Sequence, residues 1–250
     1  MKEVGRSTIK WVAIVTMLID HIRFTLIPTS PQWAGILNTA FSCIGRIAFP
    51  LFAYLLADGF LRTRSRQNYF LRLLIFAFVS EVPYDMMRDG KYLSFSHQNV
   101  IFTLLISFAA MWVVSLFREM EFFKERKNLR FFCEAAVCIL AIVAAHYSHS
   151  DYGYIGVMTV LICFYGMLIA KDNPAIAVFR PDLIAFAGGV CMLTALDETE
   201  IVALTGGFLI WAYHGKTGVK VPKVVSYGFY PLHMLLLVML RIWIYHMPIK

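Results

Sequence analysis

A carboxylate, an imidazole and a guanidinium occur within four residues of an otherwise apolar stretch, at Asp20, His21 and Arg23. Ionisable groups are costly inside an apolar helix, so each must be paired, hydrated or used for chemistry. Histidine titrates near neutral pH and a carboxylate can orient it, which suits acid–base catalysis. We predict His21 as a catalytic residue with Asp20 as its partner. The structural alternative is that Asp20 only pairs with Arg23 along one helix face.

Later apolar stretches add polar residues at a similar depth. Arg46 lies within the second stretch, Glu81 and Asp85 end the third, and Asn99 opens the fourth. We predict that these four converge with the first-helix pair on one cavity, where they bind substrate or stabilise charge. An ion pair of Arg46 with Glu81 or Asp85 is the structural alternative. Asp58 is a further candidate, although its spacing also fits a pair with the arginine four residues later.

The elements that must position these residues are membrane-spanning helices. Of the 250 residues, 59% are hydrophobic and 16% are charged, against roughly 25% charged in ordinary globular domains. Runs of about 17–25 apolar residues can cross a bilayer as helices, which satisfy their own backbone groups in lipid. The sequence therefore predicts an all-α, polytopic membrane bundle formed by one domain, residues 1–250. We expect about nine spans, with eight to ten compatible with the pattern: Ile9–Ile27, Leu37–Leu61, Tyr69–Tyr84, Asn99–Phe117, Phe131–His146, Tyr154–Ala170, Leu183–Leu196, Ile201–Tyr213 and Tyr227–Tyr245.

The basic residues test this topology, because Lys and Arg concentrate in cytoplasmic loops. They gather before the first predicted span and then in every second loop. This alternation predicts a cytoplasmic N-terminus, an external C-terminus and a location in the inner (cytoplasmic) membrane. The net charge of +7 follows from topology, so we expect no nucleic-acid partner. The five cysteines lie in apolar runs without metal-site spacing, and we expect no metal.

Six sequence blocks follow one another over nearly the whole chain. They are Met17–His21, Gly45–Phe60 with Thr63 and Arg64, Arg72–Asp85, Gln98–Leu104, Asp151–Val157 and Tyr227–His233. In this combination the chain resembles the TraX family of membrane proteins. That family is known for N-acetylation of the pilin of conjugative pili. It is distantly similar to polytopic acyltransferases, which move acyl groups from cytoplasmic acyl-CoA to outward-facing acceptors.

The resemblance implies roles for particular residues. Those acyltransferases carry an essential histidine late in their first helix, and His21 matches it. Asp58 matches an acidic position of the second helix at which many relatives carry Glu. A pattern of the closing helix is echoed by Tyr227, Tyr230 and His233, together with Ser226.

The leading hypothesis is therefore a membrane acyltransferase that uses acetyl-CoA as co-substrate. His21 would accept a proton from the acceptor or briefly carry the acyl group, and the sequence leaves both roles open. Asp20 or Glu81 would hold its tautomer, and Arg46 or Asn99 would stabilise the oxyanion. A cluster of arginines would bind the CoA phosphates: Arg62, Arg64 and Arg66. Positive-inside topology alone could also explain this cluster.

Two other classes of function remain open. A proton-coupled transporter could use Asp20, His21 and Glu81 as a relay, although no paired broken spans are visible. A non-catalytic assembly factor would need the polar residues only to hold helices together. Membrane lipid and acyl-CoA are the expected partners, and the sequence leaves the protein, peptide or glycan acceptor open.

Overall fold

The computed structural model describes residues 4–28, 32–216, 218, 222–246 and 249, and this part of the chain is helical without any β-strand. The predicted all-α class is thus confirmed. The longer helices are α1 (Arg6–Leu26), α2 (Gln32–Gly45), α3 (Ala48–Arg62), α4 (Arg66–Arg88), α5 (Val100–Glu119), α7 (Lys127–Tyr147), α8 (Gly153–Asp172), α10 (Pro181–Leu193) and α12 (Lys223–Tyr245). The short ones are α6 (Glu121–Lys124), α9 (Pro174–Ala177), α11 (Gly207–Trp211) and the 3₁₀ segment η1 (Glu198–Gly206).

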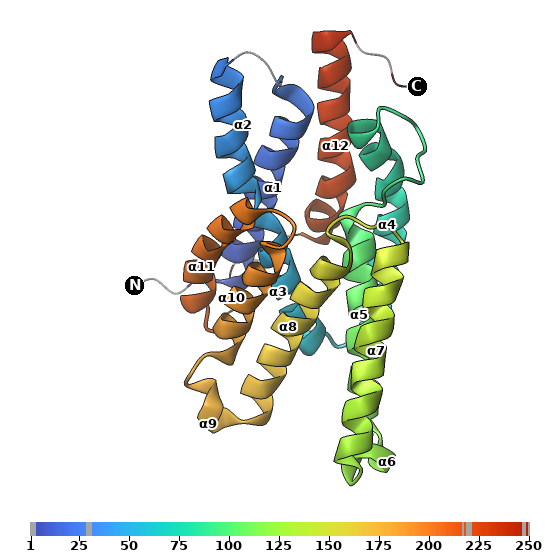
Figure 1. Cartoon of the computed structure of the whole chain (residues 1–250), viewed down its shortest axis with the longest axis vertical. Coiled ribbons are helices and arrows are strands. Elements are labelled where there is room, and N and C mark those ends of the chain that lie inside the picture. Colours follow the sequence, from blue (N-terminus) through green and yellow to red (C-terminus); the bar gives the residue numbers. More distant parts are fainter. Residues whose placement is uncertain (1–3, 29–31, 217, 219–221, 247–248, 250) are drawn as a thin grey trace.

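The helices form an elongated bundle in which α2 and α3 follow one another in the same direction (Figure 1). From α3 to α10, successive long helices run in opposite directions along the long axis. The short helices α6 and α9 lie at the lower end in that view. The ends of α1 and α12 lie at the upper end, together with the loop that follows α4. The alternation of directions agrees with the predicted order of spans, and the side of the membrane on which each end lies stays a prediction.

Five helical stretches of the described residues are long and apolar enough to cross a membrane. They are Trp33–Arg62, which joins α2 and α3, and the stretches Val100–Glu119, Lys127–Tyr147, Gly153–Asp172 and Tyr227–Tyr245. The nine predicted spans are not all supported by this finding. The helices α1 and α4 carry more charged residues, and many of these residues line the two cavities described below.

Two predicted spans take another form in the structure. The span Leu37–Leu61 is interrupted by a turn at Arg46 and Ile47, which separates α2 from α3. The span Ile201–Tyr213 is a 3₁₀ segment followed by the five-residue helix α11. Gly206 and Gly207 lie at this junction, and glycine is a poor helix former. Hydropathy therefore indicated apolar segments but could not detect these breaks.

Small residues allow α8 and α10 to pack closely. A Cβ atom added at Gly166 would overlap Ala185, and one added at Gly189 would lie 3.0 Å from Thr159 Cγ2. Such small-residue contacts are typical of helix pairs in membranes, where backbones approach for van der Waals packing. In the core, the ring of Phe60 packs edge-on against the rings of Phe108 and Phe164.

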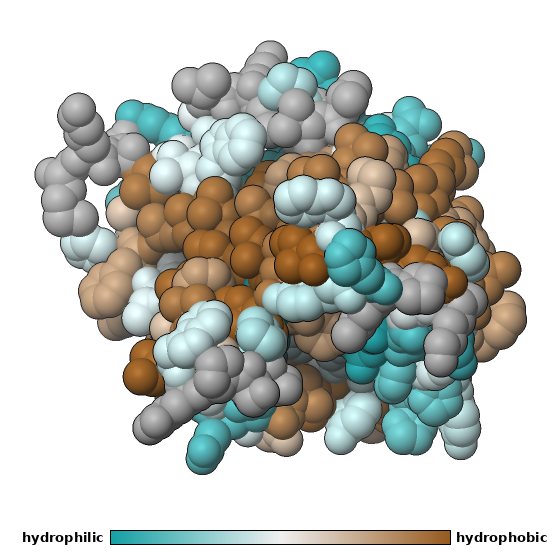
Figure 2. All heavy atoms as spheres, turned by 90° about the horizontal axis from the view of Figure 1, so that it is seen from above, coloured by the Kyte–Doolittle hydropathy of each residue, from teal (hydrophilic) through white to brown (hydrophobic). Residues whose placement is uncertain are grey.

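Many large apolar side chains point out of the bundle. On α7 and α12 they include Phe131, Leu140, Leu232 and Trp243, each at least 64% exposed. Figure 2 shows apolar residues spread over much of the surface seen from above and reaching its edge. An apolar outer surface of this extent is expected for helices in lipid and not for a water-soluble bundle. The architecture is therefore that of a membrane protein.

Candidate functional site

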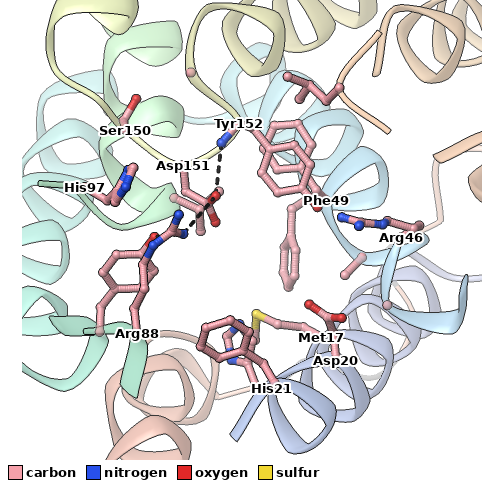
Figure 3. Close-up of a pocket in the computed structure, with 18 of the residues that line it drawn as sticks. Met17, Asp20, His21, Arg46, Phe49, Arg88, His97, Ser150, Asp151 and Tyr152 are labelled. Carbon is pink, nitrogen blue, oxygen red and sulfur yellow. Dashed lines mark hydrogen bonds and ion pairs between the residues drawn. The ribbon is translucent and has the colours of Figure 1, made fainter. Parts of the chain in front are cut away.

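A cavity of about 540 Å³ lies in the upper part of the bundle, and we call it the upper cavity. Its volume falls within the range of roughly 300–1,000 Å³ that is usual for small-molecule sites. In Figure 3, Asp20 and His21 approach it from α1, while Asp151 and Tyr152 approach it from the opposite side. The ionisable residues around it, apart from tyrosines, are Asp20, His21, Arg23, Arg46, Arg88, His97, Asp151, Asp197 and Glu200.

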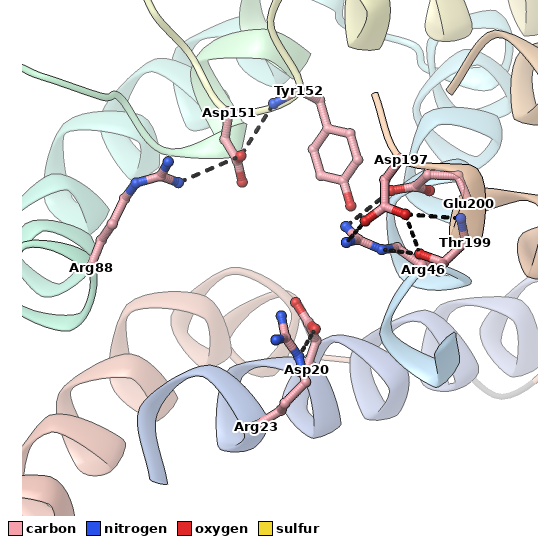
Figure 4. Close-up of polar contacts among 9 residues, drawn as sticks. All are labelled: Asp20, Arg23, Arg46, Arg88, Asp151, Tyr152, Asp197, Thr199 and Glu200. Atoms are coloured by element: carbon pink, nitrogen blue, oxygen red, sulfur yellow. Dashed lines mark hydrogen bonds and ion pairs between the residues drawn. The ribbon is translucent and has the colours of Figure 1, made fainter. Parts of the chain in front are cut away.

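Arg46 is the centre of an ion-pair group on one wall of the upper cavity. Its guanidinium lies 2.7 Å from Asp197 Oδ2 and 3.1 Å from Glu200 Oε1, and it donates to Thr199 Oγ1 at 3.3 Å (Figure 4). Hydrogen bonds from Thr199 hold the pKa of Asp197 below its usual value, with a further contribution from Arg46. Burial raises the pKa of Glu200 to about 7, although Arg46 opposes this shift. The alternative pair of Arg46 with Glu81 or Asp85 is not found among the described residues, since both carboxylates that pair with Arg46 come from the region of η1.

The opposite wall is formed by the loop between α7 and α8. Two backbone hydrogen bonds with Gln98 hold this loop, one of them from Asp151 N to Gln98 O at 2.9 Å. Tyr152 adopts a positive φ of 61°, an uncommon conformation for a bulky residue, and its ring stacks on Phe49 with centroids 3.9 Å apart. The Asp151 carboxylate lies 3.8 Å from Arg88. The local fold thus presents a carboxylate and a phenol to the cavity.

The first-helix residues make contacts of two kinds. Asp20 accepts a hydrogen bond from Arg23 Nε at 2.9 Å, which confirms the pair along the helix face. His21 instead contacts α12, where its Nδ1 lies 2.6 Å from His233 Nε2. His233 Nδ1 in turn lies 2.7 Å from the carbonyl oxygen of Phe229. Within the described part of the chain no hydrogen bond or ion pair joins His21 to Asp20 or Glu81, so His233 occupies the position expected for one of these carboxylates.

A second cavity, of about 640 Å³, lies below the first, and we call it the lower cavity. Its cationic residues are Arg6, Lys10, Arg62 and Arg72. Asp58 pairs with two of them, at 3.1 Å from Arg6 and 2.6 Å from Arg62, so the expected Asp58–Arg62 pair is confirmed. Lys10 and Arg72 form no ion pair with a carboxylate of the described residues, and both lie about 6 Å from the ring centroid of Tyr227.

The two cavities meet at a common set of residues. One stripe of α1 lines both, with Lys10 and Ile14 in the lower cavity, Met17 shared, and His21 and Phe24 in the upper cavity. This spacing of three or four residues is that of one helix face. The residues that line both cavities are Met17, Phe52, Val100, Leu104 and Tyr230.

Other residues singled out from the sequence lie away from the cavity linings. Asn99 caps α5 by accepting from Ile101 N at 3.0 Å, and its side-chain amide donates to Glu81. Asp85 accepts from Ser94 N at 2.7 Å. Neither Arg64 nor Arg66 lines the lower cavity, and Arg66 pairs with Glu119 at 2.8 Å.

Sequence reasoning did not include several residues of the site. The cationic residues Arg6, Lys10 and Arg72 and the buried Glu200 were not proposed as site residues. The stripe on α1 was detectable from its helical spacing, whereas Glu200 gave no local signal. The described residues contain no group of three or more His, Cys, Asp or Glu side chains that could hold a metal ion.

The fold and the cavities define a class of protein: an all-helical membrane protein with an ionisable site inside its bundle. The model of the family described as "TraX protein" matches residues 5–241, and the chain belongs to this family. It is also 26% identical over 247 residues to the probable fimbrial assembly protein FimC, serogroup H1, of Dichelobacter nodosus, with 92% of each chain covered. No solved structure matches the chain.

Proposed function

We propose that this protein is an acyltransferase of the inner membrane, with its N-terminus in the cytoplasm. It moves an acetyl group from cytoplasmic acetyl-CoA to an amine or hydroxyl group that enters the upper cavity. The observation that carries the proposal is that a cationic lower cavity and an acid–base upper cavity meet on one face of α1. A donor and an acceptor on opposite sides of a membrane need this arrangement.

The dimensions of α1 support the proposal. Lys10 and His21 are eleven residues apart, which corresponds to about 16 Å at the α-helical rise. A pantetheine arm is an extended chain that can bridge such a distance. Lys10 and Arg72 would bind the CoA phosphates, because no described carboxylate neutralises them. Arg62 borders the same cavity, whereas Arg64 and Arg66 would contribute only to topology.

His21 acts as the general base in this proposal. Its imidazole removes a proton from the acceptor nitrogen or oxygen, which attacks the thioester carbonyl carbon. The C–S bond then breaks, and the CoA thiolate leaves and takes up the proton from the imidazolium. Tyr230 lines both cavities with its ring centroid 6.2 Å from that of His21, and we assign its hydroxyl to the developing oxyanion. Arg46 is less available, since two carboxylates already neutralise it.

The relative in Dichelobacter nodosus is named for fimbrial assembly. The acceptor to examine first is accordingly the N-terminal amine of a pilin-type protein. The upper cavity fits an amine, since carboxylates from three parts of the chain line it: Asp20, Asp151 and Glu200.

The test is acetyl-CoA turnover by the purified protein in nanodiscs, followed as release of free thiol. We expect His21→Ala to lower kcat by about 100-fold or more, because general-base catalysis contributes roughly 10²–10⁴. His214→Ala is the matched control, since His214 is exposed and lines neither cavity. Acetyl-CoA binding is measured alongside. A wild-type protein that neither binds nor turns over acetyl-CoA would contradict the proposal and favour the proton-coupled transporter, to be tested by proton flux in vesicles.

A further inference from the structure

The contact between His21 and His233 has the geometry of a directed hydrogen bond. The two ring planes are within 5° of each other, and their centroids lie 4.9 Å apart. The nitrogen–nitrogen distance is much shorter, at 2.6 Å. The rings therefore meet edge to edge, with a nitrogen of each ring directed at the other, instead of overlapping face to face.

The hydrogen bond between His233 and Phe229 determines which nitrogens of the two histidines carry protons. The carbonyl oxygen of Phe229 can only accept, so His233 Nδ1 must carry a proton to form its 2.7 Å hydrogen bond. A neutral His233 then has a bare lone pair on Nε2. That lone pair can only accept, so His21 must donate from its own Nδ1. The remaining nitrogen of a neutral His21, Nε2, is left without a proton.

The unprotonated nitrogen belongs to a ring that borders the upper cavity. Among the residues that the structure describes, none forms a hydrogen bond with His21 Nε2, and this atom is not one of the buried polar atoms that lack a partner. His233 itself is held firmly, because its ring stacks on Phe229 with centroids 4.6 Å apart and is only 5% exposed. The orientation of His21 thus rests on a buried, closely packed part of α12.

We propose that His233 is a positioning residue that fixes His21 as the Nδ1–H tautomer and thereby keeps its Nε2 free to accept a proton. This inference rests on the proposed function for its catalytic meaning. The residue that orients a catalytic histidine is often a carboxylate, which places a negative charge beside it. A neutral imidazole performs the same orientation without bringing a second charge into an apolar bundle. When Nε2 accepts a proton, the imidazolium donates more strongly to His233, which passes the polarisation to the Phe229 carbonyl.

The test reads the tautomer directly, by nitrogen NMR of protein with isotope-labelled histidine in nanodiscs. The His21 signals are assigned by their loss in His21→Gln. We expect the wild type to show a protonated Nδ1 and a bare Nε2 at His21. His233→Phe fills the space without an acceptor, and we expect His21 to leave this tautomer. His233→Gln keeps an oxygen in place of Nε2, and we expect it to preserve the tautomer.

Turnover supplies the second readout. We expect kcat to fall by about 100-fold in His233→Phe with little change in KM for acetyl-CoA, and by less than about tenfold in His233→Gln. Wild-type His21 protonated on Nε2, or a tautomer unchanged by His233→Phe, would overturn the inference. Equal losses of kcat in both variants would also overturn it. If His233→Phe does not fold, the inference is tested by the tautomer of His21 in the wild type and in His233→Gln. Absence of turnover in the wild type would count against the proposed function alone, because the tautomer is read without substrate.

Discussion

Glu200 illustrates how a single residue acquires its chemistry from its surroundings. Its side chain is 1% exposed. Among the described residues, Arg46 is the one cation that forms an ion pair with it. Burial disfavours the charged form of a carboxyl group, and here it outweighs the attraction of Arg46. The result is an acid that changes charge near neutral pH in the wall of the upper cavity.

This shift predicts a pH-dependent stability. The pKa of Glu200 is raised from 4.5 to about 7 in the folded protein, so the folded state holds a proton that the unfolded state has released. Stability is therefore expected to fall as pH rises from about 4.5 to about 7, by up to about 3 kcal/mol. Glu200→Gln should remove this fall, as seen by thermal unfolding in detergent. Glu198→Gln, an exposed change in the same segment, should leave it intact, and the same pH profile in all three proteins would contradict the prediction.

The element that organises the molecule is α1. One face of this helix carries cationic residues at its lower end, apolar residues in the middle and His21 near its upper end, so a single helix lines both cavities. The neighbouring helix α2 approaches it closely where Gly45 lies against Asp20. The turn at Arg46 follows immediately and directs that side chain to the cavity wall.

The close approach of α1 and α2 predicts a pair of glycine variants with opposite effects. A Cβ atom at Gly45 would overlap the Asp20 side chain, so Gly45→Ala should destabilise the fold by about 1–3 kcal/mol and reduce turnover. A Cβ atom at Gly35 in the same helix would have nothing within 4 Å. Gly35→Ala should therefore leave the free energy of unfolding unchanged or raise it by up to about 1 kcal/mol. Thermal unfolding and thiol release measure both effects. Equal behaviour of the two variants would show that the helices are not in contact at Gly45.

At the scale of the whole molecule, the two cavities lie one above the other inside a bundle whose outer surface is apolar. Their shared residues are mostly apolar, with the phenol of Tyr230 among them. The unpaired cations are at one end and the acid–base residues at the other. This polarity is a property of the assembled bundle, since α1, α4 and α12 each contribute only part of it.

The polarity predicts which cations affect donor binding. Lys10→Gln and Arg72→Gln should each raise the Kd for acetyl-CoA by about tenfold, because each removes a charge-assisted contact to phosphate. Arg64→Gln should change it little, since Arg64 is exposed and lines neither cavity. Binding is measured by calorimetry in nanodiscs. A larger effect of Arg64→Gln than of the other two variants would indicate that acetyl-CoA binds at the surface and not in the lower cavity.

The accuracy of the sequence predictions varied with the distance between the interacting residues. Pairs within one helical turn, Asp20 with Arg23 and Asp58 with Arg62, were recognised from their spacing as structural alternatives and are present. The alternative that placed an ion pair between separate helices, Arg46 with Glu81 or Asp85, is not the pairing of the described residues, because polarity and depth do not specify which helices are neighbours. The roles of the candidate catalytic residues stay predictions.

The sequence by itself determined the all-helical class, most of the apolar segments, the family and the position of His21 as an ionisable residue in an apolar helix. These properties depend on composition, on local periodicity and on the order of sequence blocks. Only the tertiary structure decided that His233, 212 residues away, contacts His21, and that two cavities meet on α1. The reason is that contacts between distant segments depend on how helices pack, and packing is set by the shapes of many side chains together.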